Sequence, residues 1–274
     1  MSTEPETPDA AARARPVRLF GRFQLLRLLG KSERTMAWRV ADPRAGQELV
    51  LVLPRRQPNR PGELEHWMQK VRRAARVQHP HLAGVVETGV QDGWPFAAYD
   101  PIDAPTLAER LAGKGLPAPE VAAWAVQGLE GLAFAHEAGL AHHDLQPHLV
   151  LLSDSGQLRL IGLEVALDVT DAADAEPLRA AASTEIQALQ QQRLAAQRDV
   201  LAFGLLMHVA IAGQPALDEP DIGRVIAQMP PTGREFVRLP WTTAQPVPEA
   251  LRAICNRATD RQERHRYRNA RTLA

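Results

Sequence analysis

The residues best suited to chemistry lie in one short segment. It holds several histidines and one aspartate, which are residue types that accept protons or ligate transition metals: His136, His142, His143, Asp144 and His148. Asp144 could act as a general base, whereas the imidazoles together with Asp144 could hold a zinc ion. General-base catalysis and zinc binding require different arrangements of these side chains, so the secondary structure around the segment must distinguish the two.

Composition narrows the classes of protein. The 274 residues carry equal numbers of acidic and basic side chains, 32 of each, which argues against a nucleic-acid binder driven by phosphate contacts. The single cysteine, Cys255, excludes an internal disulfide framework and predicts a cytoplasmic location. No apolar run suggests a membrane span, and the N-terminus lacks the order of a signal peptide.

The elements that must position this segment change in character along the chain. Residues 1–18 have no apolar period and are expected to be a disordered leader. A strand-rich part follows and gives way, from Thr106 onward, to apolar residues at helical spacing. The expected strands are 23–29, 36–40, 48–53, 82–90 and 95–99, with one helix at 63–77. This order predicts an α+β fold.

Six separated segments carry a family resemblance. They are Leu28-Leu29-Gly30, Gln78-His79-Pro80-His81-Leu82, Thr106–Leu111, Leu132–Leu140 leading into His142–Leu152, Asp199–Leu206 and Arg264–Tyr267. In this order they resemble the bacterial serine/threonine protein kinases of the eukaryotic-like type, from Phe20 to Ala274. The resemblance implies a bilobal fold over residues 19–274, with an N-lobe at about 19–100 and a C-lobe at about 101–274. The last helix would be truncated at Ala274.

The resemblance also implies that the nucleotide-binding positions are degenerate. Of the family's glycine-rich loop only Gly30 remains, and Ser32 and Thr35 stand where a bare backbone would approach phosphate. We expect an ordinary β-turn there. Val52 occupies the position of the phosphate-binding lysine, and Lys70 that of its glutamate partner. Lys70 or Lys31 could be a surrogate phosphate ligand, although a solvated Lys70 is the simpler reading.

The catalytic loop retains its aspartate and loses what surrounds it. Family loops read H-R-D-L-x-x-x-N, and here Leu149 replaces the magnesium-binding Asn. Gly162 replaces the aspartate of the D-F-G motif, so neither metal ligand remains. His143 replaces the arginine that grips a phosphorylated activation loop, and Gln146 replaces the catalytic-loop lysine. Asp144 is expected to be a vestigial base that now accepts hydrogen bonds from nearby backbone amides.

Other positions implied by the resemblance are structural. His142 and Asp199 match the base of the hydrophobic spine, which Ala74 and Leu163 would continue. Arg266 matches the arginine that pairs with the glutamate of A-P-E, for which Glu185 is the nearest candidate. Glu164 is either a displaced metal ligand or a solvated side chain.

The vestigial nucleotide cleft would be lined by Leu29, Gly30, Ala37, Val50, Tyr99, Leu151 and Ile161. Tyr99, at the gatekeeper position, is bulky enough to fill it. We therefore expect a pseudokinase with weak or no ATP binding and no cofactor, acting through an unidentified protein partner, without nucleic acid or a membrane segment. It could be the cytoplasmic part of a longer, membrane-attached protein.

The alternative is an active serine/threonine kinase that binds ATP and magnesium through Lys31 or Lys70 and Glu164. A third hypothesis keeps the histidine cluster as a metal site.

Overall fold

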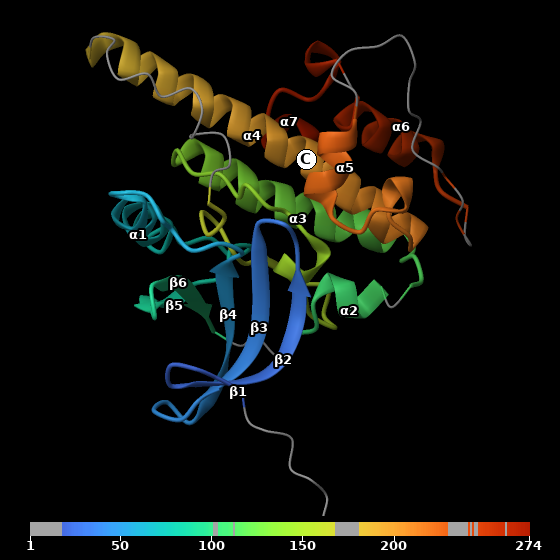
Figure 1. The fold of residues 1–274 in the computed structure, drawn as a ribbon. Coiled ribbons are helices and arrows are strands. Elements are labelled where there is room, and N and C mark those ends of the chain that lie inside the picture. Colours follow the sequence, from blue (N-terminus) through green and yellow to red (C-terminus); the bar gives the residue numbers. More distant parts are fainter. Residues whose placement is uncertain are drawn as a thin grey trace, which may run out of the picture.

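The computed structural model describes residues 18–100, 104–111, 113–167, 181–229, 241, 243, 246–260 and 262–274. The expected leader lies outside these residues, except for Arg18, which belongs to a strand. Strand-rich and helical parts occupy opposite sides of the molecule (Figure 1). The predicted α+β, two-lobed architecture is confirmed.

The small lobe is a six-stranded antiparallel sheet in the order β1-β2-β3-β4-β6-β5. The strands are β1 (Arg18–Phe20), β2 (Phe23–Lys31), β3 (Thr35–Asp42), β4 (Gln47–Pro54), β5 (Val85–Gln91) and β6 (Trp94–Tyr99). β4 is central, and Leu49 to Leu53 are all buried. One face of the sheet packs on Trp67 and Val71 of helix α1 (Glu63–Ala74).

The large lobe is built around two helices, α3 (Ala118–Glu137) and α4 (Ala181–Ala212). Trp124 of α3 meets Phe203 of α4 edge-on, with ring centroids 6.1 Å apart. A two-stranded sheet of β7 (Val150–Leu152) and β8 (Leu158–Leu160) carries the segment that follows the catalytic loop. The remaining elements are α2 (Leu107–Leu111), α5 (Ile222–Gln228), α6 (Glu249–Ala258), α7 (Ala270–Leu273) and short 3-10 turns at Pro147–Leu149, Ala216–Asp218 and Glu263–His265.

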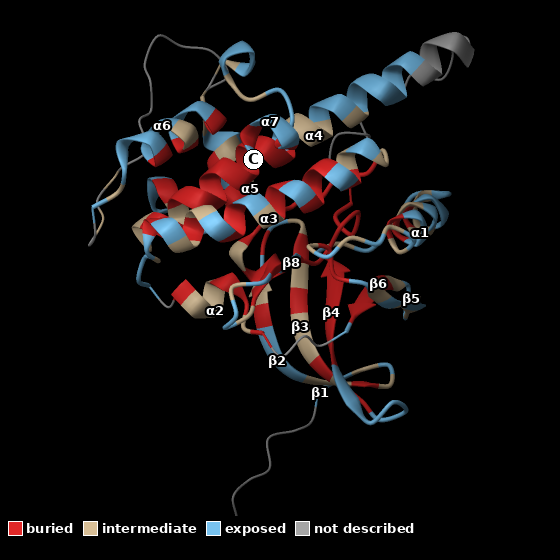
Figure 2. Cartoon of the chain, turned by 180° about the vertical axis from the view of Figure 1, so that it is seen from behind, coloured by how far each residue is buried: buried red, intermediate tan, exposed pale blue. Residues whose placement is uncertain are grey.

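Helix α4, of 32 residues, extends beyond the rest of the domain at its N-terminal end (Figure 1). Its C-terminal half runs through the core, and its N-terminal half projects from the domain (Figures 1 and 2). Ile186, Leu189 and Leu194 are exposed there. The Ile186–Ala212 stretch is long and apolar enough to cross a membrane, contrary to our reading of the sequence. However, 67% of its most apolar window is buried in the domain, as in a core helix.

Two element boundaries differ from the sequence prediction for a physical reason. Helix α1 ends at Ala74, because the chain tightens where the backbone N–H groups of Arg76 and Val77 donate to carbonyl oxygens three residues back. β5 begins at Val85, because Leu82 and Ala83 leave the small-lobe sheet. They pair instead with Leu160 of the large lobe. This pairing fixes the chain after α1 against the other lobe.

Candidate functional site

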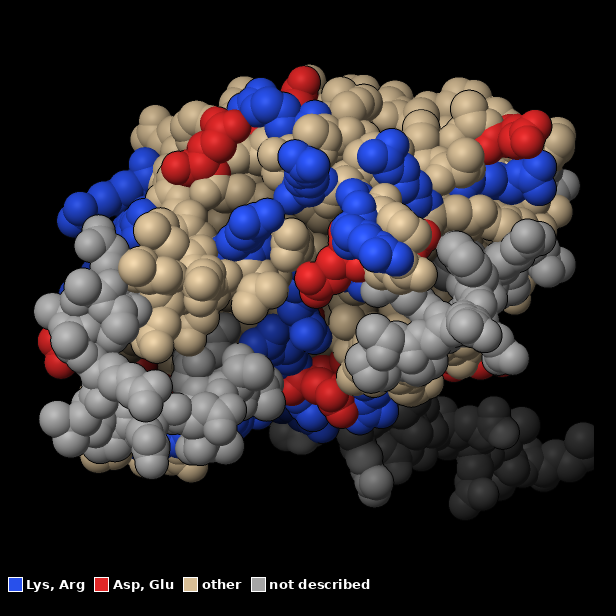
Figure 3. Space-filling model, turned by 90° about the horizontal axis from the view of Figure 1, so that it is seen from above, with Lys and Arg blue, Asp and Glu red and all other residues tan. Residues whose placement is uncertain are grey.

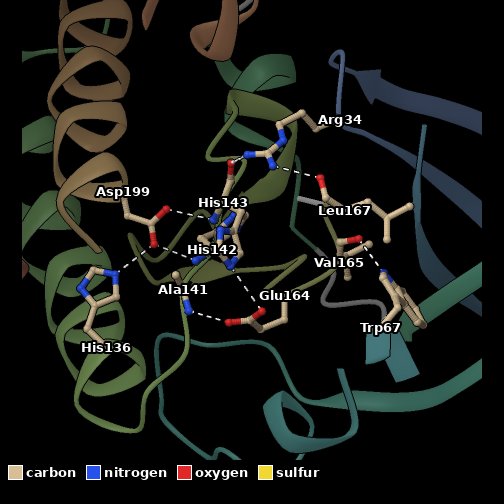
Figure 4. Close-up of polar contacts among 10 residues, drawn as sticks. All are labelled: Arg34, Trp67, His136, Ala141, His142, His143, Glu164, Val165, Leu167 and Asp199. Atoms are coloured by element: carbon tan, nitrogen blue, oxygen red, sulfur yellow. Dashed lines mark hydrogen bonds and ion pairs between the residues drawn. The ribbon is translucent and has the colours of Figure 1, made fainter. Parts of the chain in front are cut away.

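The catalytic-loop segment is anchored by one buried carboxylate that lies beside it (Figure 4). Asp199 of α4 accepts hydrogen bonds from the backbone N–H groups of His142 and His143, at 2.7 and 2.9 Å. The His136 Nε2 atom lies 2.9 Å from the same carboxylate. Burial alone would raise the pKa of Asp199, but the hydrogen bond and charge of His136, with the neighbouring histidines, hold that pKa below its ordinary value.

His142 is buried beneath the loop rather than turned toward solvent. Its Nε2 atom lies 2.8 Å from the carbonyl oxygen of Ile161, the residue directly after β8. Burial lowers the pKa of His142, so the ring is neutral and can donate that hydrogen bond. Above it, Ala74 and Leu163 join one apolar cluster that spans both lobes.

Both carboxylate oxygens of Asp144 accept hydrogen bonds. Its Oδ2 atom accepts the hydroxyls of Ser32 and Thr35 at 2.6 and 2.7 Å, and its Oδ1 atom accepts the Gln146 amide at 2.9 Å. These donors are side chains rather than the backbone amides expected from the sequence. Two of them come from the other lobe, and Asp144 is only 4% exposed. The turn between β2 and β3 therefore covers the carboxylate instead of standing clear of it.

Glu164 is neither solvated nor turned toward Asp144. It is 5% exposed, accepts the backbone N–H of Ala141 at 2.7 Å and lies 3.3 Å from His143 Nε2. The expectation of a solvated glutamate is therefore wrong. Both His143 and Glu164 adopt positive φ angles, of 67° and 61°. Such backbone is costly for these residue types, so this contact, with Asp199, holds the loop in shape.

The two metal-ligand positions offer no side-chain oxygen. Leu149 is fully buried, and Gly162 adopts a φ of 92°, a conformation that an aspartate rarely adopts. The histidine cluster is also dispersed among separate partners. Across the described ranges, no three His, Cys, Asp or Glu side chains are placed to hold a metal ion. These residues do not fit the ATP–magnesium group that the resemblance implies, and the structure does not support the zinc hypothesis.

The walls of the expected nucleotide cleft pack against one another. The apolar residues assigned to it from the sequence all belong to one cluster and are at most 8% exposed: Leu29, Ala37, Val50, Tyr99, Leu151 and Ile161. Tyr99 is the last residue of β6, the strand between β4 and β5, and it pairs with Val50 on one side and Val85 on the other. Burial raises the pKa of its phenol, which stays protonated. The side chains expected to line the cleft therefore contact one another and expose little surface to solvent.

Val52, which stands at the position of the family's phosphate-binding lysine, also belongs to this apolar cluster. Val52 is fully buried beside Trp67 and Val71 of α1, whereas Lys70 is half-buried on the same helix. The indole nitrogen of Trp67 donates a hydrogen bond of 2.8 Å to the carbonyl oxygen of Val165 (Figure 4). Lys31, at the end of β2, is exposed. An apolar contact between α1 and β4 thus stands where the family has an ion pair.

The two residues proposed to pair at the end of the large lobe are not seen to meet. Glu185 lies on α4, but its side chain is outside the described part of the chain. Arg266 follows the turn Glu263–His265 and donates from Nε to the carbonyl oxygen of Asp260. Burial lowers the pKa of Arg266. Their pairing stays a prediction.

Three residues of the site were missed from the sequence. Asp221, before α5, accepts the backbone N–H of Glu33 at 2.6 Å, and Arg34 donates to the carbonyl oxygens of His143 and Leu167. The third is Trp67. The sequence did contain one signal for the contact between the lobes. Ser32 and Thr35 replace two glycines of the loop and can donate hydrogen bonds, and the retained Asp144 can accept them.

A strand-rich lobe over a helical lobe, with an anchored loop at their junction, defines a protein of the bilobal kinase-like class. A family model described as the protein kinase domain matches residues 23–273, and the chain belongs to that family. The M. tuberculosis PknI kinase domain superposes with a TM-score of 0.60 at 21% identity, covering 95% of this chain and 96% of that one.

Curated relatives include bacterial serine/threonine kinases. PknL of Mycobacterium tuberculosis is 28% identical over 225 residues, or 75% of this chain and 53% of PknL. PrkC of Bacillus subtilis is 21% identical over 263 residues, or 92% of this chain and 39% of PrkC. This chain therefore spans about a third to a half of these two relatives.

Proposed function

We propose that this chain is a non-catalytic kinase-fold module, a pseudokinase that does not bind ATP. The observation that carries the proposal is the burial of the expected cleft walls, whose apolar side chains form a single cluster. A ligand the size of adenine needs a pre-formed concave site. Entry here would require Tyr99 and Leu29 to leave a packed core, at the cost of their burial.

The chemistry points the same way. Phosphoryl transfer depends on positioning and on neutralising the charge of the transferring group, largely through metal ions. Leu149 and Gly162 provide no metal ligand, and Val52 provides no cation. Asp144 has both oxygens engaged by Ser32, Thr35 and Gln146, so it has no free oxygen for a substrate hydroxyl.

The alternative active kinase has less support. Its metal ligand, Glu164, is engaged by Ala141 and His143 beneath the loop. Its candidate lysines lie on an exposed strand end and on the half-buried side of α1. The relatives bear the name serine/threonine kinase, but that describes those longer proteins. Only the family and its fold support the view that this chain is itself an active kinase.

A module without phosphotransfer would act by binding. We propose a protein partner and no nucleic acid, in the cytoplasm. On the face seen from above, basic and acidic side chains are interspersed (Figure 3). Affinity for a polyanion would instead favour a broad surface of one sign.

Nucleotide binding and transfer test the proposal directly. The purified protein is titrated with ATP in the presence of Mg²⁺ or Mn²⁺ while its melting temperature is followed. It is also incubated with labelled ATP beside an Asp144→Ala control. We expect no concentration-dependent rise in melting temperature and no label above the control. A saturable rise, or label that depends on Asp144, would overturn the proposal.

A further inference from the structure

The turn between β2 and β3 binds the large lobe with every one of its residues from Ser32 to Thr35. Ser32 and Thr35 are 7% and 0% exposed, although they stand at the tip of a hairpin. Both hydroxyls donate to one oxygen of Asp144, at 2.6 and 2.7 Å. A turn that only joined two strands would leave such polar groups in water.

A second carboxylate holds the middle of the same turn. Asp221 accepts the backbone N–H of Glu33 through Oδ2 at 2.6 Å. Its Oδ1 atom accepts the Gln146 amide at 2.8 Å, while that amide also donates to Asp144. Gln146 therefore bridges two acidic groups. The side chain of Glu33 continues the contact outward to Arg224, at 2.7 Å.

Arg34 makes a third contact with the large lobe, and Gly30 allows the hairpin to approach that lobe closely. The two terminal nitrogens of Arg34 donate to the carbonyl oxygens of His143 and Leu167, at 2.7 and 2.9 Å (Figure 4). The backbone of Gly30 lies so close to His148 that an added Cβ would stand 2.4 Å from the histidine side chain. The approach of the hairpin therefore depends on the absence of a side chain at residue 30.

We propose that the large lobe carries a peptide-binding groove that residues 32–35 of the same chain occupy. The groove consists of Asp144, Gln146, Asp221 and the carbonyl oxygens of His143 and Leu167. Its ligand is a short segment that presents two hydroxyls and one guanidinium. In the kinase family the aspartate of this loop receives the hydroxyl of a substrate, so Ser32 and Thr35 lie on Asp144 as an internal pseudosubstrate.

Occupation of the groove fixes the lobes in the closed arrangement. The inference is independent of whether ATP binds, because it concerns donors and acceptors on the protein alone. Removing the hydroxyls leaves Asp144 buried without two of its donors, which favours release of the hairpin. Adding a side chain at Gly30 forces the hairpin away by a different route.

Amide hydrogen exchange of the whole chain tests occupation. In Ser32→Ala/Thr35→Val we expect exchange of the Glu33 amide, which donates to Asp221, to rise by about tenfold or more, since release of the hairpin breaks that hydrogen bond. The Arg34 and Thr35 amides are not counted, because they donate to the Ser32 hydroxyl itself. Gly30→Ala should do the same. Matched controls are Ser155→Ala/Thr88→Val, which removes the same groups elsewhere, and Gly84→Ala, where an added Cβ meets nothing within 4 Å. Unchanged protection in α3 and β4 shows that the fold persists.

Binding in trans tests recognition. Gly30→Ala leaves the groove open, so a synthetic peptide of residues 29–37 should bind it saturably, and should not bind the wild-type chain. A peptide with alanine and valine in place of the serine and threonine should bind at least about tenfold more weakly. Equal binding of the two peptides, no binding to the opened variant, or unchanged exchange in the hydroxyl variant would each overturn the inference.

Discussion

The indole nitrogen of Trp67 donates a 2.8 Å hydrogen bond to the carbonyl oxygen of Val165. The bond joins α1 of the small lobe to the segment after Gly162 in the large lobe. Trp67 is 2% exposed and also packs in the cluster that contains Val52. Its apolar packing near Val52 stands where the kinase family has an ion pair, and its hydrogen bond is a separate link between the two lobes.

Trp67→Phe should keep most of the apolar contact and lose the hydrogen bond. The buried carbonyl of Val165 then has no donor from α1, so we expect the free energy of unfolding to fall by about 1–3 kcal/mol. Urea denaturation of the two proteins measures the difference. Trp38→Phe, on the half-buried side of β3, is the matched control. Equal losses in both variants would show that ring size, not the hydrogen bond, matters.

Asp199→Ala should be among the most destabilising single changes in the large lobe. It removes the acceptor of two backbone amides and of His136 in a fully buried setting. Removing one partner from a buried charged pair costs about 3–5 kcal/mol. Asp154→Ala, at a side chain that is 98% exposed, serves as the control in the same denaturation series. A loss below about 1 kcal/mol for Asp199→Ala would contradict an anchoring role.

His148 should make stability depend on pH. Burial lowers its pKa to about 4, from 6.5 in the unfolded chain. Between these values the unfolded state binds the extra proton, so stability should fall as pH falls from about 6.5 toward 4. The slope from this group approaches about 1.4 kcal/mol per pH unit.

The test for His148 is denaturation at several pH values, with His148→Leu as the variant. Its curve should be flatter across this window, because the group that titrates is gone. His66→Asn, at an exposed position on α1, should leave the curve unchanged. Parallel curves for the wild type and His148→Leu would show that folding does not change the pKa of His148.

Tyr99→Ala should leave a cavity where the expected cleft is filled. The side chain is 1% exposed within an apolar cluster, and large-to-alanine changes of this kind cost about 3–5 kcal/mol. Thermal and urea unfolding measure the loss. Tyr267→Ala, at a half-buried ring beside Arg257, should cost clearly less. A small effect at Tyr99 would mean that the cleft is loosely filled.

The strands and the order of the lobes could be predicted from the sequence, because apolar alternation and turn residues are local signals. The closed hairpin could not be predicted in the same way. Whether Ser32 points to water or to Asp144 depends on how the lobes approach each other, and the two residues lie far apart in the chain. Glu164 shows the same limit, since its burial follows from the path of the loop around Ala141.

The structure gives Gly30 a different role from the one that the glycine-rich loop of the kinase family suggests. A glycine at this position is usually taken as a trace of phosphate binding, yet here its bare backbone makes room for the His148 ring. Selection on this position would act through closure of the hairpin, so glycine could persist in a lineage long after its nucleotide had been lost. A surviving loop glycine is therefore poor evidence, by itself, that a degenerate kinase still binds ATP.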